Sequence, residues 1–396
     1  FKIKQSSLVL NGIRPQYTGQ PAVIPLGLTW EKSTTLNLGL DFAFLSNRLQ
    51  FSGDIYQRKT TDMFTVGMSL PAVFGTDVPK GNYADLTTKG FELSVSWRDQ
   101  FQLASKPFNY EVRFTLADYQ STIDKYNNPE KKLGDDYYYE GMKVGEIWGY
   151  ETEGFFTSQA DIDSHAKQPY FYAGATAGQW LPGDIKFKDL NGDGVIDYGN
   201  NTVDNPGDQK IIGNSEPRFI YGINLSGDWN NFFVSAFFQG VGKQDWWPGS
   251  EASYFWGMYN RPYNDMPKSH LGNIWTEENP NTYFPRLRGY SSEEPYAELN
   301  LKQTRYLQNI AYIRMKNIQL GYTLPKSFIS KLRMQNAKVY VSGENLWSWS
   351  PFYKYSKDLD VEAVRGSDRD LTEGTSGNGY SYPILKSVSF GLSVTF

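Results

Sequence analysis

The segment that decides the fold runs from Thr34 to Lys59 and reads TTLNLGLDFAFLSNRLQFSGDIYQRK. In its first half a large apolar side chain stands at every second position, with small or polar residues between. Because successive side chains of a β-strand point to opposite faces, this alternation predicts a strand with one apolar face. Ser46 and Asn47 supply a tight turn, and the alternation resumes at Leu49. The segment therefore predicts a β-hairpin.

The same alternation recurs to the end of the chain. It predicts further strands beginning near the following residues: Lys89, Phe108, Arg218, Phe232, Tyr312, Lys338 and Ile384. Charged residues such as Glu92, Arg98 and Arg113 occupy the polar face of the second hairpin. A hydrated lumen accepts such charges readily, whereas a soluble sheet seldom carries so many on every strand. We expect about ten or eleven strands in all.

Connections between these strands alternate between short and long. The short turns lie near Ser46, Asp99, Trp229 and Pro325. The long connections cover about residues 61–87, 120–216, 241–309 and 350–382. Outer-membrane barrels have short periplasmic turns and long extracellular loops, whereas compact soluble domains rarely tolerate such excursions. The pattern predicts an all-β transmembrane antiparallel barrel with long extracellular loops; a secreted all-β protein is the alternative.

Composition excludes several classes of protein. The 396 residues contain no run of about 18 apolar residues, so a transmembrane helix is excluded, whereas barrel strands escape such averaging. Cysteine is absent, which rules out disulfides, thiol catalysis and cysteine metal sites. The net charge of -4 and the lack of a long basic run argue against a nucleic-acid partner. Without an initiator methionine or signal peptide, we expect an N-terminal portion outside this chain.

Catalysis finds little support in the sequence. His165 and His270 are the only histidines and fall in separate predicted loops. No nucleophile elbow, phosphate-binding loop or histidine-pair zinc motif occurs. We therefore predict that the chain is not an enzyme.

One loop carries the pattern of a calcium site. Side-chain oxygens at alternate positions, with a glycine for the sharp turn, are what EF-hand-type loops use to wrap a hard cation. The residues that match are Asp189, Asn191, Asp193, Gly194 and Asp197, with the carbonyl of Val195 as a further ligand. The pattern departs at Asn200, where a bidentate Glu is expected, and Asp204 or Asp208 would have to substitute. A Gly/Asp-rich turn without an ion is the alternative.

Four segments and a terminal pair resemble one known family. They are Gly90–Val95 (GFELSV), Gly183–Gly194 (GDIKFKDLNGDG), Tyr312–Pro325 (YIRMKNIQLGYTLP), Val339–Leu346 (VYVSGENL) and Tyr382-Pro383. In this order they resemble the C-terminal part of the SusC/RagA-like TonB-dependent transporters of Bacteroidetes. The resemblance implies a barrel of about 22 strands with an internal plug. Residues 1–396 would supply roughly its C-terminal half, with the plug and the N-terminal strands outside this chain.

The resemblance also implies a function and partners. A SusD-like surface lipoprotein would lid the barrel and capture substrate, and TonB would deliver energy through the part of the protein outside this chain. The expected function is active import of a nutrient, either an oligosaccharide or a peptide, across the bacterial outer membrane. A passive porin or a surface adhesin is the competing interpretation.

Aromatic residues supply the remaining candidates. One loop gathers Trp246, Trp247, Tyr254, Phe255, Trp256, Tyr259 and Tyr263. These could stack on sugar rings or hold apolar ligand groups, or they could pack the loop on itself or on the lid. Aromatics at strand ends fit the girdles at membrane interfaces: Trp30, Tyr56, Trp97, Tyr119, Trp229, Tyr322 and Trp347. Phe396, at the end of an alternating strand, resembles the signal read by the barrel-assembly machinery; an ordinary edge strand is the alternative.

Overall fold

The computed structural model describes residues 3–18, 24–67, 73, 78–134, 137–168, 180–250, 252–263, 265–292, 297–364 and 382–396. The chain divides into two compact units. Unit 1 comprises Phe1–Asn37, Tyr56–Lys89 and Gln120–Val144, and unit 2 comprises Leu38–Ile55, Gly90–Tyr119 and Gly145–Phe396. None of the helices in the described part of the chain is long and apolar enough to cross a membrane.

Unit 2 is built on a large sheet whose nine strands lie in the order β17-β16-β15-β12-β11-β6-β5-β4-β3. Their bounds are β3 Lys32–Phe44, β4 Leu49–Val66, β5 Lys80–Leu103, β6 Lys106–Lys125, β11 Arg218–Trp229, β12 Phe232–Lys243, β15 Tyr312–Thr323, β16 Asn336–Trp349 and β17 Ser387–Thr395. Part of each of the strands β3 to β6 belongs to unit 1, namely residues 32–37, 56–66, 80–89 and 120–125. All nine strands located by alternation are therefore confirmed. In the described residues the sheet is open, with β3 and β17 at its edges.

The pairing register places apolar side chains on one face of this sheet. Val341 of β16 lies opposite Leu320 of β15 and Phe390 of β17, so the three side chains share a face. They remain exposed, Phe390 by 84% and Leu320 by 57%. A soluble sheet would bury such a stripe, whereas lipid covers it in a membrane barrel. The register therefore supports the predicted antiparallel barrel wall.

The predicted short turns near Ser46 and Trp229 are present, whereas those near Asp99 and Pro325 differ from the prediction. Asn230 and Asn231, between β11 and β12, both have positive φ (48° and 71°), as a two-residue hairpin turn requires. The turn predicted near Asp99 instead lies at Ala104 and Ser105, because β5 continues to Leu103. Asp99 is a strand residue that pairs with a cation, so its polarity does not mark a turn.

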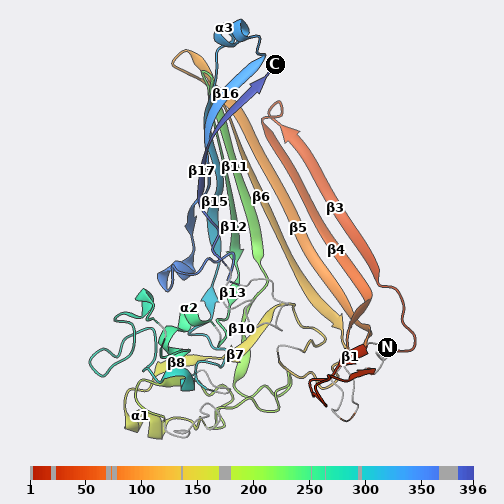
Figure 1. The fold of residues 1–396 in the computed structure, drawn as a ribbon, viewed down its shortest axis with the longest axis vertical. Coiled ribbons are helices and arrows are strands. Elements are labelled where there is room, and N and C mark those ends of the chain that lie inside the picture. Colours follow the sequence, from red (N-terminus) through yellow and green to blue (C-terminus); the bar gives the residue numbers. More distant parts are fainter. Residues whose placement is uncertain are drawn as a thin grey trace. The chain divides into compact units, whose positions relative to one another are not determined.

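The connection after Pro325 is longer than a tight turn. It contains α3 (Lys326–Ile329) and the 3-10 helix η5 (Ser330–Leu332) before β16 begins. Figure 1 shows β11, β12, β15, β16 and β17 side by side, with α3 at one end of these strands and β13 and α2 at the other. Within unit 2, the short connection after β15 and the long connection after β12 therefore lie at opposite ends of the sheet.

Two predicted loops are shorter than expected because strands continue through their ends. β4 extends to Val66, β5 starts at Lys80 and β6 ends at Lys125. In unit 1 these extensions are joined by polar side chains: Thr87 Oγ1 donates to Asp124 Oδ2 (2.5 Å), and the hydroxyls of Thr88 and Ser121 lie 2.7 Å apart. Strand extensions of this kind lack a regular apolar face, so the alternation that reveals the other strands is missing.

Two further boundaries differ from expectation. β17 begins at Ser387 rather than near Ile384. Phe219 has a positive φ of 56° and lies in a gap of the β11–β12 pairing between Arg218 and Ile220. Phe219 therefore forms an irregularity and does not continue the apolar alternation that was predicted through it.

The remaining elements are short. The strands are β1 Ile3–Gln5, β2 Gln16–Thr18, β7 Glu146–Tyr150, β8 Thr152–Phe155, β9 Ile185–Phe187, β10 Gln209–Asn214, β13 Asp245–Trp246 and β14 Gln308–Asn309. The helices are α1 Gln159–Ser164, α2 Ser253–Trp256, η2 Gly257–Tyr259, η3 Lys268–His270, η4 Gly289–Ser292 and η6 Pro351–Lys354. Apart from β1 and β2, all lie in the long connections of unit 2. We call the described residues of 145–216, 244–310 and 350–364 the loop body.

The hydrophobic core of unit 2 lies almost entirely in the loop body. Of the buried residues that form one cluster, only Val241 and Tyr312 come from the long strands, and both stand near strand ends. The largest fully buried side chains include Trp256, Tyr259 and Tyr306. The loop body is therefore a folded, aromatic-packed structure rather than a set of simple tethers.

Candidate functional site

The face of the sheet opposite the apolar stripe is polar and concave. Alternation along β5 and β6 brings the predicted polar residues together there, and Arg98 lies 3.7 Å from Glu111, which also pairs with Arg113 at 3.1 Å. Arg48 pairs with Asp99 at 3.2 Å. A concavity of about 890 Å³ is lined by residues that include Arg48, Arg98, Asp99 and Glu111. These charges, which lipid would exclude, are the lining expected of a water-filled lumen.

A second concavity, of about 400 Å³, extends this face across the sheet. Asp54, Glu92, Thr115 and Gln239 line it, which places residues of β4, β5, β6 and β12 on one surface. Gln239 lies opposite Arg314 of β15 in the strand register. Because directly paired residues share a face, Arg314 belongs to the lumen side as well.

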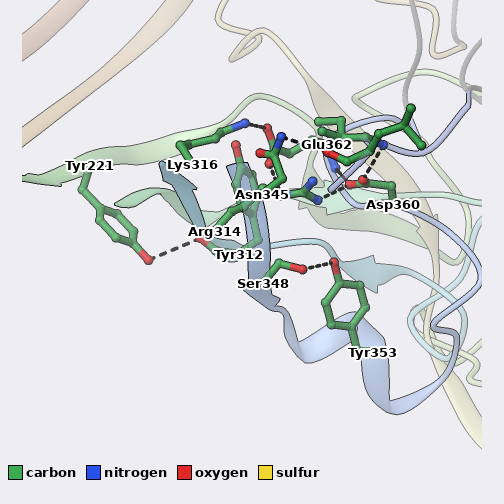
Figure 2. Close-up of polar contacts among 11 residues, drawn as sticks. Tyr221, Tyr312, Arg314, Lys316, Asn345, Ser348, Tyr353, Asp360 and Glu362 are labelled. Atoms are coloured by element: carbon green, nitrogen blue, oxygen red, sulfur yellow. Dashed lines mark hydrogen bonds and ion pairs between the residues drawn. The ribbon is translucent and has the colours of Figure 1, made fainter. Parts of the chain in front are cut away.

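Arg314 is the centre of a buried ionic network (Figure 2). Its Nη2 contacts Asp360 Oδ1 at 2.5 Å, and its Nε forms an ion pair with Glu362 Oε1 at 2.5 Å. Lys316 pairs with the same Glu362. The side chains of Arg314, Asp360 and Glu362 are 4%, 8% and 12% exposed. The network thus joins two cations of the sheet to two carboxylates of the connection after β16.

The acidic residues of this network also order their own backbone. Asp360 Oδ1 accepts a hydrogen bond from Glu362 N, and Asp360 Oδ2 accepts one from Ile384 N, both at 3.0 Å. Nearby, the hydroxyls of Ser348 and Tyr353 lie 3.2 Å apart (Figure 2). Asp360 therefore holds together the point where the chain leaves the loop body and the point where it returns towards β17.

The aromatic candidates divide into buried and exposed residues. Trp246 and Trp256 are 4% and 0% exposed and belong to the hydrophobic cluster, together with Phe255 and Tyr259. The Trp246 ring lies 5.9 Å from Phe352, edge to face. For these four residues the structure places the side chains where they pack the loop body on itself, which was the alternative to ligand binding.

The other aromatic candidates remain accessible. Tyr254 and Tyr263 are 56% and 79% exposed, and Trp247 is half-buried against Trp256. Ligand binding through Trp246, Trp247, Tyr254 and Trp256 stays a prediction, in which the exposed Tyr254 is the member that a ligand could reach without rearrangement of the loop body.

A buried charge cluster lies beneath the loop-body surface. The Asp184 carboxylate is 0% exposed, accepts Arg288 Nε at 2.7 Å and lies 3.4 Å from Arg286. Glu298, also 0% exposed, accepts Ile185 N at 2.9 Å through Oε2, while its Oε1 has no hydrogen-bond partner. Burial, and next to it the Asp184 charge, raises the pKa of Glu298 to about 8. Glu298 is therefore largely protonated at neutral pH.

The loop with the calcium pattern is ordered by its own side chains. Asp189 accepts Gly192 N at 2.6 Å and Gly194 N at 2.9 Å, and Asp193 accepts Val195 N at 2.8 Å. Similar bonds involve Asn191 and Asp197, which accept Asp193 N and Gly199 N. Across the described residues, no group of three or more acidic or histidine side chains converges in a geometry that could hold a metal.

Asp208 is committed to the backbone of this loop. It is fully buried, and its two oxygens accept Leu190 N at 2.7 Å and Asp197 N at 2.9 Å. Burial raises its pKa above the ordinary value for an aspartate. Asp208 thus fixes both ends of the loop core, and calcium binding by this loop stays a prediction.

Only part of the predicted girdle lies at strand ends. Trp229, Tyr322 and Trp347 are at or near the ends of β11, β15 and β16, and Trp30 precedes β3. The strand-end prediction is wrong for Tyr56, Trp97 and Tyr119, which lie inside β4, β5 and β6 because these strands are longer than predicted. Trp229 Nε1 donates to Leu103 O at 2.9 Å, and Trp97 Nε1 donates to the Tyr110 hydroxyl at 3.1 Å. Phe396 directly follows β17 and is 79% exposed. Its role as an assembly signal stays a prediction.

Sequence reasoning missed the ionic network and the buried cluster. The signal for the network is nonetheless present, since Arg314 and Lys316 interrupt a strand at a spacing of two and Asp360 and Glu362 repeat that spacing with the opposite charge. Nothing local indicates that these pairs meet, because 46 residues separate Arg314 from Asp360. Glu298 likewise looks like an ordinary loop carboxylate in the sequence.

Comparisons with known proteins agree with this geometry. The chain is 28% identical to TonB-dependent receptor P3 of Formosa agariphila, over 93% of the chain and 34% of that protein. It is 26% identical to TonB-dependent receptor P26 of the same organism and 23% identical to TonB-dependent receptor SusC of Bacteroides thetaiotaomicron, over 99% and 96% of the chain. The chain spans about a third of the length of these relatives. No protein-family model matches the chain.

The fold has a close counterpart among solved structures. A chain of the RagAB peptide transporter superposes with a TM-score of 0.70 at 19% identity, covering 100% of this chain and 38% of that chain. The structure agrees with this likeness, because its nine-stranded sheet has an apolar outer face and a polar inner face. The chain is an outer-membrane β-barrel segment that is similar to about a third of the length of the SusC-like TonB-dependent receptors.

Proposed function

We propose that the complete protein containing this chain imports a bulky nutrient, an oligosaccharide or a peptide, across the outer membrane at the expense of TonB-delivered energy. The observation that carries the proposal is the charged concave face that runs from β4 to β15 on the side opposite the lipid-facing stripe. Relatives named TonB-dependent receptors support the energy coupling, and their naming as receptors fits the prediction that the chain is not an enzyme.

A SusD-like surface lipoprotein is the proposed partner of the loop body. The RagAB assembly, named as a peptide transporter, has the related fold. Exposed apolar side chains of the loop body, among them Tyr263 (79%) and Leu271 (65%), offer surface for such a partner. The barrel-assembly machinery is proposed to read Phe396 during insertion.

Uptake measurements separate active import from the porin and adhesin alternatives. Cells that express the complete protein would be given fluorescent oligosaccharides and fluorescent peptides, with and without an uncoupler of the inner membrane. Active import predicts accumulation of one class that stops when the proton gradient is dissipated. Uptake that persists with the uncoupler would indicate a porin, and surface retention without uptake would indicate an adhesin.

A calcium ion in the 189–197 loop is proposed as a structural ligand. Asp189, Asn191, Asp193 and Asp197, with the carbonyl of Val195, supply the oxygen donors that Ca²⁺ prefers. The bound ion would stiffen the loop body around β9 and β10. Protease resistance of the loop body should rise on adding Ca²⁺ after chelation, and Asp193→Ala, which removes the oxygen donor, should abolish the rise. Equal resistance with and without Ca²⁺ would contradict the proposal.

A further inference from the structure

The segment 350–364 connects the hydrophobic cluster of the loop body to the large sheet of unit 2. We call it the strap. On one side, Phe352, Leu359, Val361 and Val364 are buried in the hydrophobic cluster of the loop body. Tyr355 stacks on Tyr283 at 4.1 Å. On the other side, the strap presents the two carboxylates that Arg314 and Lys316 bind.

The cations that bind the strap belong to the inner face of the sheet. Arg314 pairs in register with Gln239 on one neighbouring strand and with Ser348 on the other. Gln239 lines the polar concavity. The strap is therefore attached to the lumen side of β15 and not to its lipid side, at the end of the strand next to the loop body.

Energetics indicate what this attachment is for. A buried ion pair recovers little more than the cost of removing its charges from water, so it adds little stability by comparison with apolar packing. What it can supply is a unique position, because the two carboxylates meet their cations in only one place. Asp360 uses its second oxygen on Ile384 N, which ties that position to the return of the chain towards β17.

We propose that Arg314 is a positioning residue that, with Lys316, holds the strap at one place against the lumen wall, so that the entrance to the lumen has a fixed width during import. The inference rests on the proposed function for the meaning of the lumen, but the position of the strap can be measured without any transport. Loss of the Arg314 contacts leaves the aromatic side of the strap packed and frees its acidic side.

The first test measures the position of the strap in the complete transporter. This chain has no cysteine, so a spin-label pair at Lys357 of the strap and Ser226 of β11 requires only removal of cysteines elsewhere in the protein. Both positions are exposed. We expect one narrow distance distribution in the parent protein and a distribution at least twofold broader in Arg314→Met. An unchanged distribution in Arg314→Met would overturn the proposal.

A matched variant separates positioning from general damage to the wall. Arg218 forms a bidentate pair with Asp118 at 2.6 Å, in strands that do not contribute to the strap network. Arg218→Met should leave the strap distances unchanged, whereas equal broadening in both variants would contradict a specific role. If Arg314→Met does not assemble, Glu362→Gln keeps the size of the side chain while removing its charge and should broaden the same distribution.

A second measurement tests whether the position of the strap limits entry into the lumen. Entry of a large hydrophilic antibiotic into cells that express the complete transporter should rise severalfold in Arg314→Met and remain low in Arg218→Met. Broadened distances without increased entry would show that the strap does not limit the entrance and would overturn that part of the proposal. A failure of energy-dependent uptake in the parent protein, with the distances as expected, would count against the proposed function alone.

Discussion

The sheet and the loop body place their apolar side chains in opposite ways. In the sheet, Leu320, Phe390 and Leu392 point outward and are 57%, 84% and 67% exposed. In the loop body, Trp256, Tyr259 and Tyr306 are fully buried and belong to one hydrophobic cluster with Phe352 of the strap. One part of the chain uses lipid as its apolar environment, and the other builds its own.

This difference separates two sources of stability within one unit. The strands gain from backbone pairing and from lipid around their outer face, because an unpaired backbone group in a bilayer costs several kcal/mol. The loop body stands outside the bilayer and must bury apolar surface as a soluble domain does. Removing a large apolar side chain should therefore destabilise the loop body more than the sheet. Adding a charge should destabilise the sheet on its outer face but not on its inner face.

The largest effect is expected from truncating the loop-body core. Trp256→Ala would empty a site that is 0% exposed and would remove the Nε1 hydrogen bonds to Pro248 O and Gly249 O, both 3.0 Å. We expect the loop body to lose about 3–5 kcal/mol of unfolding free energy. Urea-dependent proteolysis of the purified complete protein measures this loss. Leu320→Ala on the lipid face is the control, and equal losses from the two substitutions would contradict the comparison.

A charge placed on the outer face of the sheet should have the next largest effect. Val341 lies on the lipid side near the middle of β16, and Ser342 follows it on the lumen side. Val341→Arg is expected to cost about 2–4 kcal/mol if the residue lies near the bilayer midplane, whereas Ser342→Arg meets water. Urea-dependent folding into lipid vesicles compares the two variants. Similar stability of both would show that the two faces are not in different solvents.

The smallest effect concerns the pH response of the loop body. Burial, and next to it the Asp184 charge, raises the pKa of Glu298 from its ordinary value of 4.5 to about 8, although Arg286 and Arg288 act in the opposite direction. Tyr259 and Tyr306 also interact with this carboxyl group. Between these two pH values the folded state binds more protons than the unfolded state. The stabilisation is thus complete below pH 4.5 and is lost progressively as the pH rises to about 8.

A neutral replacement tests that response. Glu298→Gln should flatten the decline in loop-body stability between pH 5 and pH 8. Glu277→Gln, at an exposed position in the same connection, should leave the decline as it is. The urea midpoint of loop-body proteolysis at several pH values reports both variants. A slope that is unchanged in Glu298→Gln would assign the pH response to other groups.

The sheet could be predicted from the sequence because its signal is local. Each strand repeats the apolar side chain every second residue, and the lipid face leaves those residues visible in the pattern. The prediction of strand boundaries failed where polar residues lie within a strand and do not mark a turn or a loop. Asp99 suggests a turn but is a strand residue paired with Arg48, and the extensions of β4 to β6 in unit 1 are joined by side chains such as Thr87 and Asp124.

The loop body could not be predicted in the same way, because its contacts join distant parts of the chain. Trp246 and Trp256 look like ligand-stacking residues until Phe352 and Tyr306 are seen to pack against them. The ionic network has the same property, since the partners of Arg314 lie in a separate connection. The sequence indicated which residues carry charge or aromatic rings but not which of them meet.

The most direct test of the account is a spin-label scan of Lys338 to Gly343 in the complete protein, reconstituted in lipid. Collision rates with oxygen and with a water-soluble nickel chelate report lipid and water at each position. Val339 and Val341 should favour oxygen, and Lys338, Tyr340 and Ser342 should favour nickel, with a period of two. Loss of that alternation, or water contact at every position, would contradict a barrel wall with one face in lipid and the other lining a lumen.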